Sequence, residues 1–173
     1  GLGTPFLRLA VRPVRRSHQD VAEAVAVQVV RSGDRESELG AGLGADVALT
    51  YLNEKSKRFV EPVAATTEAS LLLPMDVSVP GELESVFERI GRDWGRLDIL
   101  VHSIAFSDKS ELKGSFVENT TRENFLRTMD ISAFSFVAAG KRASKLMKRD
   151  GSMITLTYLG AERVLPSYNV MGV

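Results

Sequence analysis

The sequence contains no cysteine and only two histidines, His18 and His102. Without thiols there is no disulfide, thiolate metal site or cysteine nucleophile, and two imidazoles are too few for most zinc sites. No apolar run approaches the ~20 residues that span a bilayer. The 22 basic and 22 acidic residues give a formal net charge of zero, so no net field attracts nucleic acid or an anionic membrane. We therefore expect a soluble, cytoplasmic protein without a metal centre.

The 173 residues, 44% hydrophobic and 25% charged, suit one globular domain with a sizeable core. From Gly44 onward, apolar runs alternate with helical patterns. The runs predict strands at residues 45–52, 70–77, 97–104 and 152–158. Strands that alternate with helices are typical of a parallel sheet covered on both faces. The sequence therefore predicts the α/β class.

The helix expected after the second strand has clear end signals. Ser78 is expected to cap its N-terminus, with Pro80 in the first turn, and Gly95 is expected to close it. Apolar residues recur at helical spacing between these ends, at Leu83, Val86, Phe87, Ile90 and Trp94. This pattern predicts an amphipathic helix packed on the sheet.

A longer helix is expected further along the chain. Thr120 and Glu123 form a capping-box pair that begins a helix reaching about Met147, and Gly151 is expected to end it. Its larger apolar residues are Phe125, Met129, Phe134, Phe136, Val137 and Leu146. They offer more apolar surface than one sheet face needs, which predicts self-association; a helix buried only within its own domain is the alternative.

Residues 1–43 do not follow this pattern. FLRLAVRPVRRSHQ is basic and free of acids, which fits an irregular arm better than an Arg-rich targeting peptide. VAEAVAVQVV is apolar on every side and fits helix or strand. GAGLGA, at residues 40–45, precedes a strand, whereas a phosphate-binding loop must follow one and open a helix. We therefore interpret Gly44 as a helix C-cap.

From Gly44 onward the sequence resembles the enoyl-acyl-carrier-protein reductases of the short-chain dehydrogenase/reductase superfamily. The resemblance rests on GADVALTYLNEK, PMDVS, WGRLDILVHSIAF, MDISAFSF and LTYLGAERVLPSYNVMG, which follow the family's order and spacing. It implies a Rossmann-like doubly wound sheet in residues 44–173, serving as a dinucleotide-binding domain without the family's C-terminal strands. Residues 1–43 lie outside the resemblance.

The resemblance also implies an activity. Family members use NADH to reduce the double bond of an enoyl-acyl-carrier-protein thioester, in the last step of each fatty-acid elongation cycle. Tyr168 matches the family's catalytic tyrosine, with Tyr158 beside it. A phenol with a pKa of ~10 stays protonated at neutral pH and can donate a hydrogen bond to an enolate oxygen. Ordinary packing of both phenols is the alternative.

A lysine separates this family from its relatives. The family places it seven residues after the tyrosine, which is two positions beyond Val173, so the chain resembles an incomplete copy. Most short-chain dehydrogenases place the lysine four residues after their tyrosine. Gly172 and Glu162 stand four residues after Tyr168 and Tyr158. The resemblance therefore favours an enoyl reductase over a dehydrogenase that acts on hydroxyl groups.

Five further positions match family contacts. Asp76 and Val77 match the contact to the adenine ring of the cofactor. Ser103 and Ile104 match positions along the cofactor. Ser107 matches a position on the substrate side. The resemblance thus implies a cofactor site at the carboxyl ends of the strands.

Chemistry alone leaves other interpretations open. The carboxylate of Asp76 could instead cap the following turn. His102 fits a strand-end histidine with a satisfied ring better than a general base. After the first matched strand, residues 52–54 offer no positive charge for a 2′-phosphate and only Lys55 is basic. The cofactor prediction is therefore NADH rather than NADPH.

The N-terminal region departs from the family. The first strand and its glycine loop should fall between about residues 19 and 35, where Val25 and Val27 occupy positions expected to be glycine or small. The sequence therefore suggests an altered N-terminal region. We expect this chain alone to lack reductase activity and the complete protein to be a homotetramer. A non-catalytic α/β module and another short-chain dehydrogenase remain the alternatives.

Overall fold

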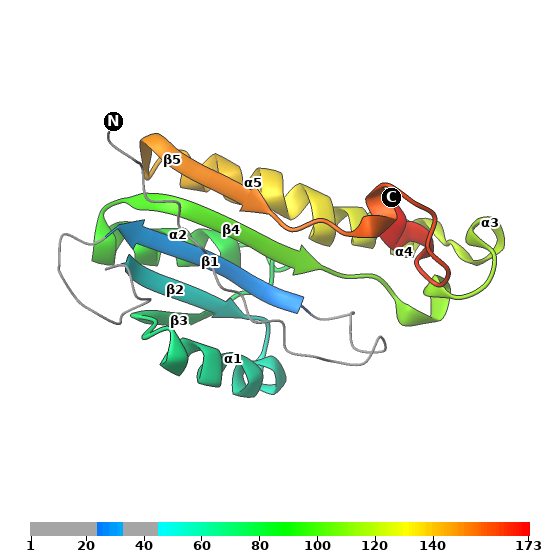
Figure 1. The fold of residues 1–173 in the computed structure, drawn as a ribbon, viewed down its shortest axis with the longest axis horizontal. Coiled ribbons are helices and arrows are strands. Elements are labelled where there is room, and N and C mark those ends of the chain that lie inside the picture. Colours follow the sequence, from blue (N-terminus) through cyan, green and yellow to red (C-terminus); the bar gives the residue numbers. More distant parts are fainter. Residues whose placement is uncertain (1–23, 33–44) are drawn as a thin grey trace, which may run out of the picture.

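The computed structural model of the protein describes residues 24–32 and 45–173 (Figure 1). The strands are β1 (Ala24–Ser32), β2 (Ala45–Tyr51), β3 (Leu71–Pro74), β4 (Leu97–Ala105) and β5 (Met147–Thr155), in the sheet order β3-β2-β1-β4-β5. The helices are α1 (Glu54–Thr66), α2 (Glu82–Trp94), α3 (Phe116–Asn119), α4 (Arg122–Met129) and α5 (Ser135–Ala143). The predicted α/β class is confirmed. The glycines at 40–44, including Gly44, lie outside the described residues.

One strand departs from the expected parallel sheet. β2 and β3 are parallel, as are β4 and β5, but β1 is antiparallel to both of its neighbours. Ala24 lies opposite Ala105, so β1 begins at the edge where β4 ends. Because VAEAVAVQVV is apolar on both sides, the segment suits a central strand in either direction.

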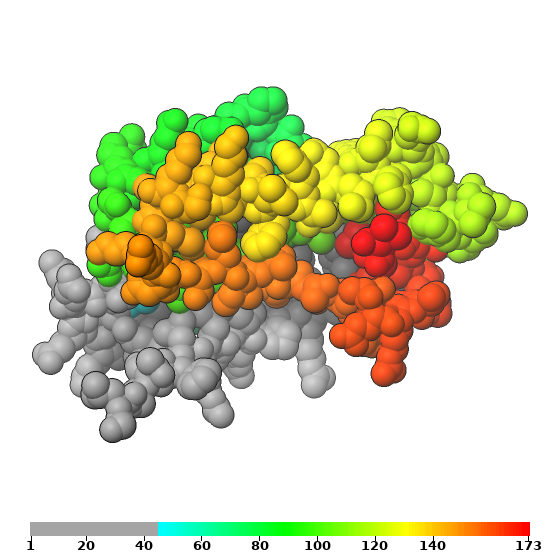
Figure 2. Space-filling view, turned by 90° about the horizontal axis from the view of Figure 1, so that it is seen from above, coloured from blue at the N-terminus to red at the C-terminus, as the bar shows by residue number. Residues whose placement is uncertain are grey.

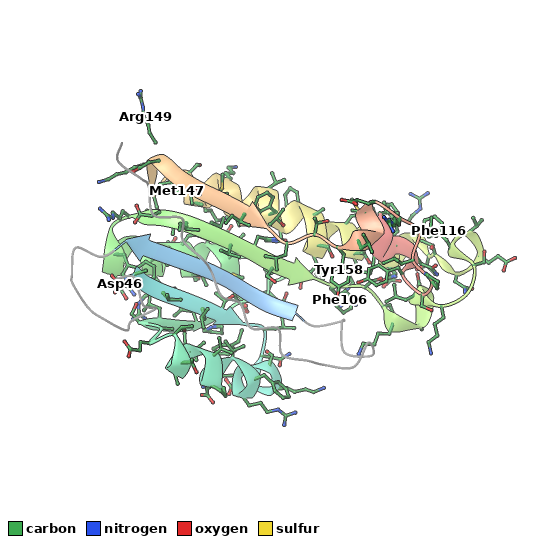
Figure 3. The ribbon with its side chains drawn as sticks, viewed as in Figure 1. Asp46, Phe106, Phe116, Met147, Arg149 and Tyr158 are labelled. Atoms are coloured by element: carbon green, nitrogen blue, oxygen red, sulfur yellow. The ribbon has the colours of Figure 1, made fainter. Side chains whose placement is uncertain are left out.

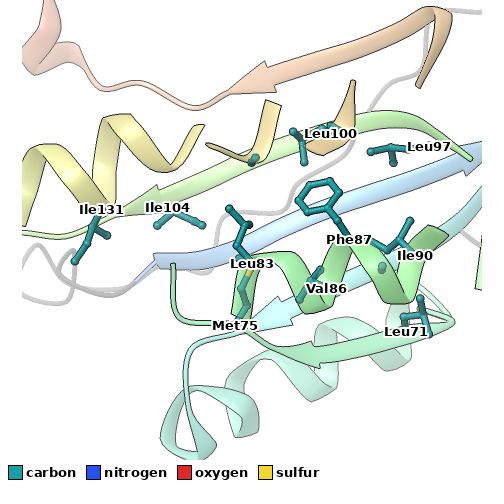
Figure 4. Packing of buried hydrophobic residues seen from close by; sticks show 13 residues of the cluster. Leu71, Met75, Leu83, Val86, Phe87, Ile90, Leu97, Leu100, Ile104 and Ile131 are labelled. Atoms are coloured by element: carbon teal, nitrogen blue, oxygen red, sulfur yellow. The ribbon is translucent and has the colours of Figure 1, made fainter. Parts of the chain in front are cut away.

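The two faces of the sheet are covered by different helices. On β2, Ala48 belongs to the core cluster that includes α2, whereas the ring of Tyr51 lies under the Lys57 ammonium of α1, 5.6 Å from its centroid. Successive side chains of a strand point to opposite faces, so α1 and α2 cover opposite faces. α5 contacts both α2 and β4. Figure 4 shows the core between α2, α5 and the sheet, formed by Leu71, Met75, Leu83, Val86, Phe87, Ile90, Leu97, Leu100, Ile104 and Ile131.

Helix α2 begins later than expected, so the prediction of Ser78 as its N-cap is wrong. The Asp76 carboxylate accepts from the Ser78 N–H at 2.8 Å and the Ser78 hydroxyl at 2.6 Å, which holds Ser78 in a turn. Gly81, at φ 92°, is the N-cap instead. The predicted C-cap is confirmed, because Gly95 at φ 70° donates its N–H to the Gly91 carbonyl.

The predicted long helix is divided in two. α4 begins after Thr121 rather than Thr120, and the Thr121 side chain accepts from the Asn124 N–H. A π-helical turn at Asp130–Phe134 separates α4 from α5. The hydroxyl of Ser132 bonds to both the N–H and the carbonyl of Phe106, which ties this turn to the end of β4.

Gly151 does not end a helix, because the helix ends at Ala143 and Gly151 lies within β5. The Leu146 carbonyl accepts from the Leu97 N–H, so the chain enters the sheet at this point. The β4–β5 pairing is irregular between Leu97 and Ile99. A Cβ at Gly151 would stand only 3.1 Å from the Met147 Cβ, so glycine suits this tight backbone.

Candidate active site

The carboxyl ends of β2, β3, β4 and β5 meet at one edge of the sheet. Phe106, just after β4, and Tyr158, just after β5, lie at this end, while Asp46 and Met147 lie at the other (Figure 3). In open α/β sheets, ligands bind outside the carboxyl ends of the strands. The sequence-predicted residues at strand ends therefore belong to the edge where a site is expected.

The end of the described chain returns to this edge through two short 3-10 turns, η4 (Leu159–Ala161) and η5 (Asn169–Gly172). η5 contacts η4, α4 and the 3-10 turn η2 (Lys109–Leu112). Figure 2 shows this red segment against the yellow-green region of α3 and α4. Segments far apart in the sequence thus form one cluster.

Tyr158 and Tyr168 meet in this cluster. Their ring centroids are 5.3 Å apart with the planes tilted by 32°. A Cβ on Gly160 would stand 3.0 Å from Cδ1 of Tyr168, so glycine lets the ring lie close to the backbone. Tyr158 is 57% exposed, whereas the Tyr168 hydroxyl oxygen is buried without a hydrogen-bond partner among the described residues. The pair thus joins an accessible phenol to a buried one.

The environment of Tyr168 favours its protonated form. Burial raises the pKa of Tyr168, and the neighbouring Tyr158 phenol raises this pKa further, although the two hydroxyls lack hydrogen-bond geometry. A buried donor without a partner costs about 1–3 kcal/mol. The Tyr168 hydroxyl is therefore a protonated donor suited to a ligand oxygen, such as an oxyanion that develops during a reaction.

His102, on β4, is in the opposite condition. Its Nδ1 is 3.2 Å from the Thr155 hydroxyl, and its Nε2 is 2.7 Å from the Ser135 hydroxyl. The Ser135 hydroxyl donates to the Ile131 carbonyl, so it accepts from Nε2. Burial lowers the pKa of His102. The prediction of a histidine with a satisfied ring is confirmed.

The two residues predicted to contact the adenine ring have structural roles in the fold. The Asp76 carboxylate caps the following turn through Ser78, which is the alternative that the sequence left open. Val77 is partly buried against the core cluster. Both bonds to Ser78 use the Oδ1 atom of Asp76. The second carboxylate oxygen of Asp76 could therefore accept from another donor. The adenine role of this pair stays a prediction.

Ser103 and Ile104, predicted along the cofactor, and Ser107, predicted on the substrate side, are placed differently from one another. Ser103 and Ile104 lie opposite Ala26 and Val25 in the β1–β4 ladder, and Ile104 is buried in the core. Ser107 follows β4, is 2% exposed, and its hydroxyl accepts from the Asn124 side-chain amide at 3.1 Å. Sequence reasoning therefore brought the two tyrosines together but gave no sign of what surrounds Ser107.

Sequence reasoning missed a polar network beside the tyrosines. Asn124 is 6% exposed, and its amide binds Ser107, Asp108 and Glu111. Asn169, next to Tyr168, donates to the Glu111 carbonyl. One available signal was the asparagine after Tyr168, since asparagine tolerates unusual backbone conformations at turns. Asn124, in the first turn of a helix, resembles an ordinary surface residue in sequence.

The described residues offer no loop of the kind that binds the pyrophosphate of a dinucleotide. A pyrophosphate needs free N–H groups on a loop that follows a strand and opens a helix at the carboxyl edge. Within the described ranges, β1 brings its first residue, Ala24, to this edge instead, and Val25 and Val27 pair with β4. The pyrophosphate half therefore does not fit residues 24–32 and 45–173, and the catalytic role of the tyrosine pair stays a prediction.

Two other classes of site find no support in the described part of the chain. There, no three histidine, aspartate or glutamate side chains converge as metal ligands. None of the helices in these ranges combines the length and apolar character that a membrane span requires.

The chain matches known proteins over most of its length. A family model described as enoyl-(acyl carrier protein) reductase matches residues 37–173. An NADH enoyl-[acyl-carrier-protein] reductase of Rhizobium meliloti is 51% identical over 133 residues, which cover 77% of this chain and 49% of that protein. A Salmonella typhimurium relative with this activity in its name, FabI, is 43% identical over 75% of this chain and 49% of its own length. The chain thus spans about half the length of these relatives.

A solved structure agrees with these matches. The reductase of Anaplasma phagocytophilum, in complex with NAD, has a TM-score of 0.70 and 47% sequence identity. The match covers 77% of this chain and 50% of that one. Fold, family model and sequence identity agree, and the chain belongs to the enoyl-acyl-carrier-protein reductase family.

Proposed function

We propose that Tyr158 and Tyr168 form the proton-donating side of an active site that reduces the double bond of enoyl-acyl-carrier-protein thioesters with NADH. The observation that carries the proposal is the buried, protonated and unpartnered hydroxyl of Tyr168 beside the accessible Tyr158. The names of the matched relatives give the same activity for those proteins. A cytoplasmic location goes with this proposal.

Tyr168 acts on the oxygen of the substrate. Reduction of an enoyl thioester pushes negative charge onto the thioester oxygen, and a donor aimed at this oxygen stabilises the charge as it develops. The raised pKa of Tyr168 keeps its proton in place at neutral pH. Tyr158, with more than half of its surface exposed, lines the path by which the substrate reaches the site.

The residues after β2 support NADH over NADPH. The Asn53 side chain caps α1 by accepting from the Ser56 N–H. The Lys57 ammonium lies 3.7 Å from Glu54 and 3.9 Å from Glu61, so it is already paired. The Arg58 guanidinium lies over the Phe59 ring. A 2′-phosphate needs an available cation at this place; Lys57 and Arg58 have other contacts, which leaves the exposed Lys55 as the remaining basic residue of this segment.

A non-catalytic α/β module is the second candidate for the 173-residue chain taken alone. The antiparallel β1 favours it, because this strand does not lead into a loop at the carboxyl edge. We therefore propose that the chain alone turns over no enoyl thioester. Clear NADH oxidation with a crotonyl thioester by exactly these residues, abolished by Tyr168→Phe, would reject the second candidate.

A chimaera tests the first proposal. Residues 45–173 would replace the matching segment of the Rhizobium meliloti reductase, which supplies the rest of a complete enzyme. We expect NADH oxidation with a crotonyl thioester, and its loss in Tyr168→Phe. Tyr51→Phe is the matched control, because Tyr51 lies on the α1 side of β2. Equal turnover in the parent and in Tyr168→Phe would remove Tyr168 from the mechanism.

Self-association in the complete protein is part of the proposal. Leu126 of α4, Phe134 of the π-helical turn and Val137 of α5 are 59%, 59% and 64% exposed. Large exposed apolar groups of this kind mark association surfaces, and closed symmetric oligomers are the common outcome. We propose a homotetramer. A monomeric chimaera in sedimentation at micromolar concentration would contradict this.

A further inference from the structure

Tyr168 lies between two residues with left-handed backbone. Ser167 has φ 60° and Asn169 has φ 36°, a region that residues other than glycine adopt rarely. Asparagine tolerates the region better than most residues, but such a backbone persists only where neighbouring contacts fix it. The contacts of Asn169 therefore influence how Tyr168 is presented to the site.

The side chain of Asn169 reaches across the site. Its Nδ2 donates to the Glu111 carbonyl at 2.7 Å, joining residues 58 positions apart in the sequence. Glu111 belongs to η2, which packs against η5. The bond therefore fastens the turn that follows Tyr168 to a separate segment of the chain.

Glu111 is itself held in place. Its carboxylate accepts from the Thr121 N–H at 3.0 Å, from the Thr121 hydroxyl at 2.8 Å and from the Asn124 amide at 3.0 Å. The Thr121 N–H and hydroxyl lower the pKa of Glu111, which keeps it charged. Because three bonds tie its side chain to the start of α4, the carbonyl that receives Asn169 is a fixed point.

The same network reaches the end of β4. The Asn124 amide donates to the Ser107 hydroxyl, and its carbonyl oxygen accepts from the Asp108 N–H at 3.0 Å. Asn124 thus holds the segment after β4 and Glu111 together. These hydrogen bonds link the end of β4 to the turn that follows Tyr168.

We propose that Asn169 and Glu111 are a positioning pair that holds the Tyr168 ring against Tyr158. Neither residue touches the reacting atoms; both act through the place of Tyr168. The proposal rests on the proposed function only for the catalytic importance of Tyr168. The ring arrangement itself can be measured without any activity.

The first test uses the full 173-residue chain and two matched glycine substitutions. Asn169→Gly keeps the left-handed backbone available but removes the amide, whereas Ser167→Gly eases the backbone and leaves the amide. The chain has three tyrosines, so ring-labelled samples can be assigned by Tyr→Phe variants. We expect the NMR contact between the Tyr158 and Tyr168 rings to survive in Ser167→Gly and to be lost in Asn169→Gly.

Glu111→Gln is the second variant. In the parent chain the Thr121 and Asn124 donors bond to the Glu111 carboxylate, and in the variant they would face the NH₂ group of the new amide. We expect the ring contact to weaken in this variant, with unfolding midpoints confirming that each chain is folded. A ring contact unchanged in both Asn169→Gly and Glu111→Gln would overturn the proposal. If Asn169→Gly does not fold, Glu111→Gln decides the question alone.

The chimaera gives the functional readout. Asn169→Gly should lower kcat about tenfold, because a small displacement of a catalytic group is costly, while KM for NADH stays unchanged. In a Tyr168→Phe background the same change should have no further effect on kcat. An additional loss there would overturn the claim that Asn169 acts through Tyr168. If the chimaera is inactive, the proposed function fails, and the ring contact still decides the positioning pair.

Discussion

His102 and Tyr168 are both polar rings near the carboxyl half of the sheet, yet their polar atoms are in opposite conditions. Both ring nitrogens of His102 have partners, in Thr155 and Ser135. The Tyr168 hydroxyl is buried and has none among the described residues. Folded proteins pair nearly all buried polar groups, so an exception needs an explanation. The comparison suggests that His102 serves the fold and that Tyr168 is kept for a ligand.

The sharpest test of this comparison is turnover in the chimaera. Tyr168→Phe should lower kcat by about 10²–10³, the usual cost of one lost oxyanion donor. His102→Gln, which keeps a polar side chain under α5, should change kcat little. Steady-state assays with NADH and a crotonyl thioester measure both. A larger loss in His102→Gln than in Tyr168→Phe would reverse the assignment.

Stability should show the opposite order in the 173-residue chain. His102→Ala should lower the free energy of unfolding by about 2–4 kcal/mol, because it leaves a cavity and strands two hydroxyls. Tyr168→Phe should leave it unchanged or raise it by up to about 1 kcal/mol, since the lost hydroxyl has no described partner. Urea unfolding of both variants provides the measurement. A marked loss of stability in Tyr168→Phe would show that its hydroxyl has a structural partner.

Gly160→Ala should disturb Tyr168 and leave His102 alone. The added Cβ would stand 3.0 Å from Cδ1 of Tyr168, so the ring must shift by a few tenths of an ångström. We expect about a tenfold loss of kcat in the chimaera. Gly140→Ala is the control, because its Cβ would meet only the flexible Met153 side chain, at 3.5 Å. Equal activity in the two variants would show that the Tyr168 ring tolerates displacement.

The pH dependence of stability should reveal His102. Burial lowers its pKa in the folded state, so the unfolded chain binds the proton more readily. Its contribution is complete above the unfolded pKa of about 6.5 and is lost as pH falls from there through the folded pKa. The unfolding free energy of the parent chain should therefore fall more steeply below that pH than that of His102→Gln. Identical slopes would mean that His102 is not buried in its neutral form.

Much of the fold followed from local pattern. The strands at 45–52 and 97–104 and the apolar stripe of α2 were predicted because alternation and helical spacing are local properties. The start of α2 was not, because Asp76 captures Ser78 through contacts that the pattern does not express. The division of the long helix at Asp130–Phe134 also depends on a distant partner, the backbone of Phe106.

The sequence by itself determined the α/β class, through residue order and spacing, and the resemblance of its motifs implied the family and the place of Tyr158 beside Tyr168. Tertiary structure alone decided the direction of β1, because an apolar strand can join a sheet either way round. It also decided which polar groups are satisfied: Ser135 reaches His102 from 33 positions away, and Asn169 reaches Glu111 from 58. Hydrogen bonds between distant residues exist only once the chain has folded, so no local pattern could reveal them.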